Sequence, residues 1–223
     1  MNNKLKSLLQ FLEITWVKNE HGQNTYVVEL EQGCIVIDAG CSVEKISQIT
    51  NKPIKAVFIT HGHYDHIQNI EEYDKLNVPI YASEHLSETL QDSDSNGSYL
   101  FNNRTTYKVK NIHSVTDGKQ IEIDNLTITC IQTKGHTKDG YCFLVKYKTE
   151  QVLFSGDTLF ALGIGRTDLK TASAKELMDS LNKLQNLEYN LLLPGHGESS
   201  TSAKQQNIIP KWIRYIKLTN REL

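Results

Sequence analysis

The chain has 223 residues, of which 39% are hydrophobic, and a formal net charge of -2 at pH 7. This size and composition predict a single globular domain over residues 1–223 with a sizeable apolar core. Scattered charges give no electrostatic case for nucleic acid or a membrane surface as a partner. The first twenty residues lack a continuous apolar core and a small-residue cleavage site, so we expect a cytoplasmic protein.

The first third of the chain predicts a β-meander, followed by alternating helices and strands. Short β-branched or alternating runs between polar turns are typical of strands. Ser42 and Ser83 are suited to cap the helices that follow them. We expect strands at Phe11–Trp16, Thr25–Leu30, Cys34–Asp38, Ile54–Thr60 and Pro79–Ala82, and helices at Val43–Thr50, Asp65–Leu76 and Ser83–Leu90.

The stretch Gln91–Asn103 has no clear period and is long for a passive connection. It is polar except for Tyr99, Leu100 and Phe101. Two interpretations remain open: a flap that covers a substrate, or an ordinary surface loop whose aromatic side chains dock on the core.

The second half of the chain repeats the pattern of β-rich sequence followed by helices. Strands are expected at Ile121–Ile123, Leu126–Gln132, Tyr141–Lys146, Gln151–Ser155 and Tyr189–Leu193, and helices at Ser173–Leu187 and Ile208–Leu218. Two β-rich stretches, each accompanied by helices, favour two sheets packed back to back with helices outside.

Four cysteines lie at no spacing that is typical of a metal site or a redox motif: Cys34, Cys41, Cys130 and Cys142. We expect reduced, largely buried thiols. Cys41 follows the strand end at Asp38, so a thiolate ligand is an alternative there, although packing in the core is the preferred interpretation.

The segment from His61 to His66 carries four potential metal ligands, namely His61, His63, Asp65 and His66, directly after a predicted buried strand. Alternate residues such as His61 and His63 are able to point to the same side. Imidazole nitrogen and carboxylate oxygen both suit zinc, iron or manganese. The segment therefore predicts a metal centre of the kind found in metallohydrolases.

Three later sites also place a histidine or a carboxylate directly after a predicted strand, next to glycine: His136, Asp157 and His196. If both sheets end at one edge, these loops converge there, and the glycines allow the backbone close to the ions. The remaining histidines, His21, His85 and His113, lack this setting and are interpreted as ordinary surface residues.

Taken together, these motifs resemble those of the metallo-β-lactamase superfamily, whose His-x-His-x-Asp-His signature matches His61, His63, Asp65 and His66. The resemblance implies an α+β fold, a four-layer αββα sandwich of two mixed sheets flanked by helices. It also implies that His61, His63 and His136 hold one ion, that Asp65, His66 and His196 hold the other, and that Asp157 bridges them. Asp38 would then brace the histidine loop from outside the ligand set.

Within the superfamily, the run from Phe154 to Phe160, followed by Gly165-Arg166-Thr167-Asp168, resembles short glyoxalase II enzymes, the hydroxyacylglutathione hydrolases. The chain departs from the family's pattern at residues 67–70 and 137–140, and it ends before the helical domain with which longer members hold glutathione. Two roles are open for Arg166: a substrate contact, or a structural ion pair with Asp168.

These features predict a hydrolase with two divalent ions per chain, zinc first and iron or manganese as alternatives, that cleaves a small-molecule thioester by attack of metal-bound hydroxide. Asp65 and Asp157 are expected to orient that hydroxide. Alternatives are a persulfide dioxygenase with a single iron on His61, His136 and Asp157, and a metallohydrolase of another ester or a lactone. The residue pattern leaves the actual substrate and the oligomeric state open.

Overall fold

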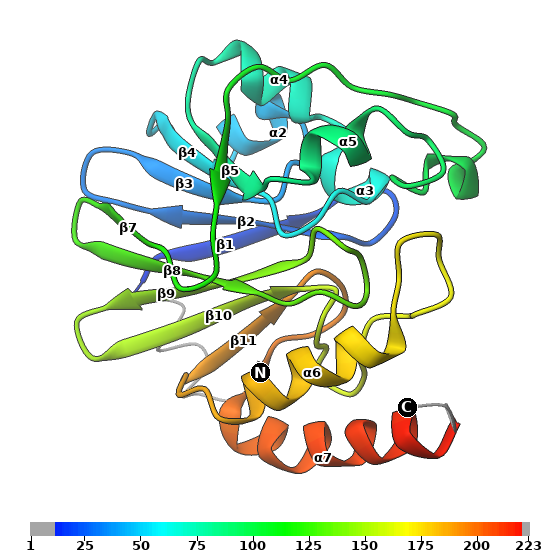
Figure 1. The fold of residues 1–223 in the computed structure, drawn as a ribbon. Helices are drawn as coiled ribbons and strands as arrows, with labels where there is room; N and C mark the ends of the chain where they lie inside the picture. Colours follow the sequence, from blue (N-terminus) through cyan, green and yellow to red (C-terminus); the bar gives the residue numbers. More distant parts are fainter. Residues whose placement is uncertain (1–11, 220–223) are drawn as a thin grey trace.

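Two mixed β-sheets lie face to face in the computed structural model, which describes residues 12–219 (Figure 1). The first sheet has the order β1 (Ile14–Lys18), β2 (Asn24–Glu29), β3 (Cys34–Ile37), β4 (Ile54–Phe58), β5 (Ile80–Ser83) and β6 (Ile112–Val115). The second has the order β12 (Ser200–Thr201), β11 (Leu191–Pro194), β10 (Glu150–Gly156), β9 (Tyr141–Tyr147), β8 (Leu126–Gln132) and β7 (Gln120–Ile123). Strands β3 to β6 pair in parallel, as do β10 and β11, and the other pairs are antiparallel.

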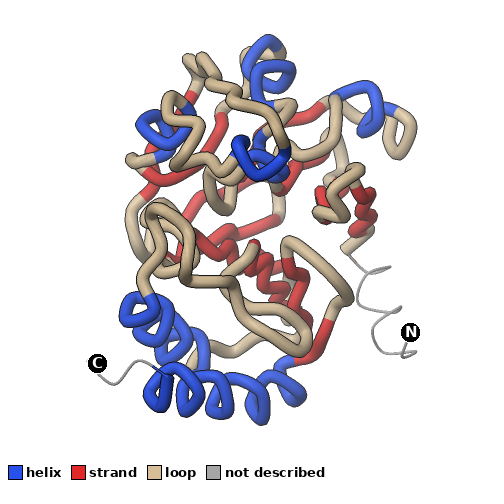
Figure 2. Tube along the Cα trace, turned by 90° about the vertical axis from the view of Figure 1, so that its right-hand side faces the viewer, coloured by secondary structure: helices blue, strands red, loops and turns tan. Residues whose placement is uncertain are grey.

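Helices cover the outer face of each sheet (Figures 1 and 2). The first sheet carries α2 (Val43–Ser47), α3 (Tyr64–Ile67), α4 (Ile70–Lys75) and α5 (Leu86–Leu90), and the 3-10 helix η1 (Ser98–Phe101) follows α5. The second sheet carries α6 (Ala174–Gln185) and α7 (Ser202–Thr219). The expected four-layer αββα sandwich is confirmed.

Three apolar clusters hold these four layers together, one between the sheets and one between each sheet and its helices. They arise because successive side chains of a strand point to opposite faces of its sheet. In β2, for example, Val27 packs toward the helices and Val28 toward the opposite sheet. Aromatic rings fill the space between the sheets, where Phe58 meets Phe143 with ring centroids 5.2 Å apart. Strands buried on both faces read as continuous apolar sequence, which is why they were predictable.

Several element boundaries differ from the sequence-based expectation. The helix expected over 65–76 is two short helices, because the backbone N–H of Asn69 donates to Ala39 O at 3.0 Å and so leaves the helical ladder. The side-chain amides of Gln68 and Asn69 add hydrogen bonds to the carbonyl of Gly40, each at 2.8 Å. Ser83 ends β5 instead of capping a helix, and α5 begins at Leu86.

The other differences concern edges and ends. Strands β6 and β12 were not expected, and α7 begins at Ser202, within a polar stretch that shows no apolar period. The first strand begins at Ile14, and Phe11, where it was expected to start, lies outside the described residues.

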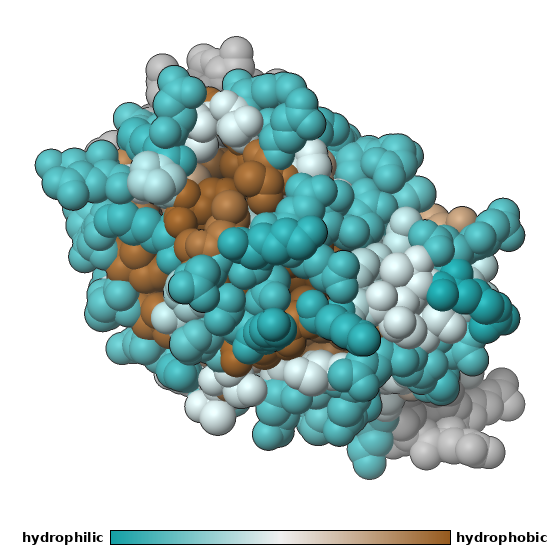
Figure 3. All heavy atoms as spheres, turned by 90° about the horizontal axis from the view of Figure 1, so that it is seen from above, coloured by the Kyte–Doolittle hydropathy of each residue, from teal (hydrophilic) through white to brown (hydrophobic). Residues whose placement is uncertain are grey.

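The face above the first sheet is mostly hydrophilic, with apolar residues visible between the polar side chains (Figure 3). Leu76, at the end of α4, is 42% exposed. Within residues 12–219, no helix has the length and apolar character that are needed to cross a membrane.

Candidate metal centre

The predicted ligands lie together at one edge of the sandwich, on the right in Figure 1. His61 follows β4, Asp157 follows β10 and His196 follows β11. Two backbone hydrogen bonds tie the sheets together at this edge, because the N–H of Tyr141 donates to Thr60 O and the N–H of Asn24 donates to Gly195 O, both at 2.7 Å. The loops from both sheets therefore converge on one small volume.

Three histidines form the first compact group. Nδ1 of His63 lies 3.1 Å from Nε2 of His61 and 2.9 Å from Nε2 of His136. All three side chains are buried. Three ring nitrogens this close, with no carboxylate between them, are arranged to share one cation.

The second group joins histidines to carboxylates. Nε2 of His196 lies 2.9 Å from Asp65 Oδ2, and Nε2 of His66 lies 3.8 Å from the same oxygen. Asp157 lies between the groups, with Oδ1 3.3 Å from His66 Nε2 and Oδ2 3.7 Å from His136 Nε2. This places Asp157 in the position that the resemblance implies for a bridging ligand.

Hydrogen bonds behind the ligands fix which ring nitrogen is free. Nδ1 of His66 donates to Asp38 Oδ2 at 2.7 Å, since a carboxylate only accepts. Nδ1 of His136 donates in the same way to the carbonyl of Arg166 at 2.9 Å. In both rings Nε2 is left to face the cluster.

A relay through Thr60 does the same for His61. The hydroxyl of Thr60 donates to Asp38 Oδ2 at 3.0 Å, so its oxygen accepts from Nδ1 of His61 at 3.1 Å. The N–H of Thr60 also donates to Asp38 Oδ1 at 2.8 Å. One buried carboxylate thus orients two histidines, the bracing position that the resemblance implies for Asp38.

The electrostatics of the cluster suit a cation. Burial and the neighbouring histidines lower the pKa of His61 and His63, that of His63 to about 3, so both rings offer lone pairs. Burial opposes charge on His66, but the carboxylates of Asp38, Asp157 and Asp65 outweigh burial and raise its pKa. Burial likewise opposes charge on Asp157, but His66 and His196 outweigh it and lower the pKa of that carboxyl.

Two buried polar atoms show that the protein alone does not complete this cluster. Nε2 of His66 and Oδ1 of Asp157 have no hydrogen-bond partner. Unsatisfied buried polar atoms are costly and few in folded proteins. Facing one another among nitrogen and oxygen donors, these atoms fit a bound divalent cation.

Glycine is required where the backbone closes over the ligands. A Cβ at residue 195 would overlap Oδ1 of Asp157 and come within 2.6 Å of His66 Cε1. A Cβ at residue 165 would overlap the carbonyl of Asp157 and lie 2.8 Å from His136 Cγ. Gly195, directly before His196, and Gly165 are therefore needed for the close approach of the backbone to the ligands.

Asp139 is a residue of this site that sequence reasoning missed. Its buried Oδ2 accepts the N–H of Gly62, between His61 and His63, at 3.1 Å. Thr60 was missed as well. In the sequence, Asp139 and Thr60 stand out only because they are close to the ligand motifs. Each of them acts through a residue that is distant in the sequence and that only the fold brings near.

For Cys41 the structure favours packing in the core over a ligand role, whereas Arg166 fits both of its alternatives, the ion pair and the substrate contact. The thiol of Cys41 is buried in the core, with Val17 O 3.9 Å from its sulfur, and it lies outside the ligand groups. Arg166 forms a two-contact ion pair with Asp168, at 2.6 and 2.7 Å, and also lines a cavity of about 150 Å³ over the ligands.

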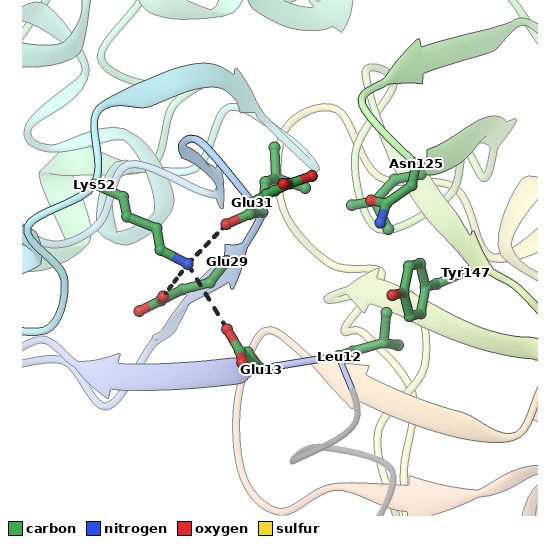
Figure 4. A pocket seen from close by; sticks show the side chains of 9 residues that line it. Leu12, Glu13, Glu29, Glu31, Lys52, Asn125 and Tyr147 are labelled. Atoms are coloured by element: carbon green, nitrogen blue, oxygen red, sulfur yellow. Dashed lines mark hydrogen bonds and ion pairs between the residues drawn. The ribbon is translucent and has the colours of Figure 1, made fainter.

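Another, larger cavity lies at the opposite edge of the sheets, beside the β2–β3 and β7–β8 turns (Figure 4). Its volume is about 430 Å³, and Lys52 there is paired with Glu29 at 2.9 Å and with Glu13 at 3.8 Å. No predicted ligand lines it. Cavity size alone would therefore point away from the predicted metal site.

The αββα fold and the His/Asp cluster together define the class of metal-dependent hydrolases built on this sandwich. The chain belongs to the metallo-beta-lactamase superfamily, whose family model matches residues 19–196. The probable metallo-hydrolase YqgX of Bacillus subtilis is 30% identical over 193 residues, which cover 84% of this chain and 90% of YqgX.

Two solved structures are similar in fold. BLEG-1, a B3 metallo-beta-lactamase, superimposes with a TM-score of 0.79 at 28% identity, over 89% of this chain and 99% of BLEG-1. TTHA1623, solved in a di-iron-bound form, gives a TM-score of 0.71 at 25% identity, over 88% of this chain and 99% of TTHA1623.

Proposed function

We propose that the chain is a binuclear metal-dependent thioesterase of the glyoxalase II kind. The observation that carries this proposal is the seven-residue cluster, with its two buried partnerless atoms, at the floor of a cavity. The membership of the chain in a superfamily of metallohydrolases supports hydrolysis, and the motif from Gly165 to Asp168 supports a thioester as the bond that is cleaved.

In this proposal His61, His63 and His136 hold one ion and Asp65, His66 and His196 the other, with Asp157 shared. When bound, two such ions supply a water of lowered pKa and a Lewis acid for the carbonyl oxygen. Zinc suits the nitrogen-rich donor set, and the di-iron form of TTHA1623 makes iron the main alternative.

The chain's own residues orient and enclose the reaction. Asp38, directly and through Thr60, holds the rings of His66 and His61 in the tautomers that face the cluster. Asp65 and Asp157 line the cavity and would orient the attacking water. Hydrolysis breaks the C–S bond, forms a C–O bond, and releases a carboxylate, a thiol and, at neutral pH, a proton.

Ligand substitutions test this proposal. We expect His61→Ala and Asp157→Ala to abolish cleavage of S-lactoylglutathione and of a simple aliphatic thioester while circular dichroism shows folded protein. His113→Ala removes an exposed histidine outside the cluster and is the matched control, expected to keep wild-type activity. Turnover that persists in either ligand variant would contradict the proposal.

Two further assays separate the alternatives. Oxygen uptake with a persulfide, together with one iron per chain, would favour the dioxygenase. Hydrolysis of a β-lactam, the activity in the name of BLEG-1, would move the assignment to lactamase chemistry. The proposal expects neither.

A further inference from the structure

The cavity above the ligands has one apolar side. Besides His63, Asp65, His136 and Asp157, it is lined by Asn96, Gly97, Leu100, Phe101, Arg166 and Leu169. We call Leu100, Phe101 and Leu169 the apolar wall. Leu100 is 47% exposed, so a bound apolar group would bury part of it.

The segment that carries most of the apolar wall is held in place. The N–H of Tyr64 donates to Asn96 O at 2.7 Å, and Asn103 Nδ2 donates to the hydroxyl of Tyr64 at 2.9 Å. The ring of Phe101 packs on His21, with centroids 4.4 Å apart. Of the two interpretations of Gln91–Asn103, the structure therefore favours an anchored loop that nonetheless forms a wall of the cavity.

The polar side chains of the cavity outside the ligand cluster are already engaged. The amide of Asn96 accepts from the N–H of Ser98 at 2.9 Å and donates to Thr105 O at 2.9 Å. Any anion at Arg166 would have to share that guanidinium with Asp168. Arg166 commits two of its five N–H groups to Asp168, and the apolar wall itself offers no hydrogen-bond partner to a substrate hydroxyl placed against it.

We infer that this cavity takes the acyl chain of the thioester and selects short, unsubstituted aliphatic chains over hydroxyacyl chains. The inference rests on the proposed thioesterase function, and it gives this chain a different acyl preference from the hydroxyacyl substrates of the glyoxalase II enzymes that its motifs resemble. A cavity volume of about 150 Å³ suits a short acyl chain better than a long one. A hydroxyl placed against the apolar wall would lose its water without gaining a partner.

The decisive comparison is propanoyl against lactoyl, because these acyl groups differ by one hydroxyl. Both are presented as thioesters of N-acetylcysteamine, with each kcat/KM divided by the rate of cleavage by hydroxide alone. We expect propanoyl to be favoured roughly 10- to 100-fold. Between acetyl and pentanoyl, kcat/KM should rise about fourfold for each CH₂ group that is buried, and it should fall at octanoyl.

Leu100→Ser and Leu169→Ser should reduce the preference for propanoyl, since each places a hydroxyl in the apolar wall. Leu162→Ser is the matched control, because Leu162 is 80% exposed and lies outside this cavity. Leu162→Ser should keep the wild-type preference.

The outcomes distinguish the two proposals. Equal use of lactoyl and propanoyl, or a preference unchanged in Leu100→Ser and Leu169→Ser, would overturn the inference and leave the thioesterase intact. If no thioester is cleaved, the proposed function fails, and binding of propanoate against lactate, followed by ligand-observed NMR, still tests the cavity. Lactate binding as tightly as propanoate would then overturn the inference as well.

Discussion

At the scale of residues, the site depends on one strained aspartate. Asp38 has a φ of 65°, in the left-handed region that residues other than glycine seldom adopt. Aspartate tolerates this conformation better than most residues, and here it directs both carboxylate oxygens to the Thr60–His66 side. Such strain is typical of sites where geometry serves function.

The relay through Thr60 leads to a first prediction. Thr60→Val keeps the shape of the side chain but removes the oxygen that accepts from His61 Nδ1. We expect about 10- to 100-fold weaker zinc binding, the usual cost of losing a partner behind a metal ligand. Competition with a chromophoric chelator measures this change.

Thr60→Ser retains the hydroxyl and is the control, with zinc affinity within a few-fold of wild type. If Thr60→Val binds zinc as tightly as the wild type, the relay has no role in orienting His61.

The sequence predicted which side chains would gather, but not what orients them. His61, His63, Asp65 and His66 were recognisable because strand-end motifs place ligands at short, fixed spacing. The partner of Asp139 is a backbone N–H 77 residues away, so only the fold reveals it. Long-range partners of this kind leave no local pattern.

At the scale of elements, the loop that carries His136 is seated on the start of α6. The N–H of Ser173 donates to Gly135 O at 2.8 Å, and Gly135 has a φ of 129°. A Cβ at this glycine would overlap the backbone nitrogen of Leu177. The position of a metal-binding loop is thus set by a helix on the outer face of the second sheet.

Gly135→Ala should therefore displace His136 as well as destabilise the fold. We expect a loss of roughly 3 kcal/mol or more in the free energy of unfolding, from backbone strain and overpacking together. Metal content per folded chain should also fall. Urea denaturation and elemental analysis measure the two effects.

Gly118→Ala is the matched control, because Gly118 has a φ of 78° but open space where its Cβ would be. Strain alone should cost about 1–2 kcal/mol there, with metal content unchanged. If Gly118→Ala and Gly135→Ala give the same result, contact with α6 does not position the loop.

Boundaries were predictable only where packing and local sequence agree. The strand β4 reads as a buried run, and it was expected. The edge strand β6 was missed because His113 and Ser114 are exposed, and an edge strand needs only backbone pairing with β5. The break between α3 and α4 was missed because the carbonyls of Ala39 and Gly40, which accept from Gln68 and Asn69 there, are far along the chain.

At the scale of the whole molecule, two back-to-back sheets with helices outside were predictable because β-rich and helical stretches occur twice along the chain, and the resemblance to the superfamily implied the four-layer sandwich. The ligand cluster lies at one end of the sandwich, and the larger of the two cavities lies at the other end. The cavity of about 430 Å³ lies among hairpin turns, and the cavity of about 150 Å³ lies over the ligands. Sequence motifs predicted which end carries the metal ligands, whereas the shape and the lining of the cavity over them could be seen only in the structure.

We propose that the ligand cluster holds two divalent ions that are needed to hydrolyse a thioester. The most direct test measures metal content per chain on freshly purified protein, alongside thioester cleavage before and after removal of metal by a chelator. We expect two ions per chain, loss of cleavage on chelation, and recovery on return of zinc. One iron per chain with no thioester cleavage would contradict the claim and favour sulfur dioxygenation.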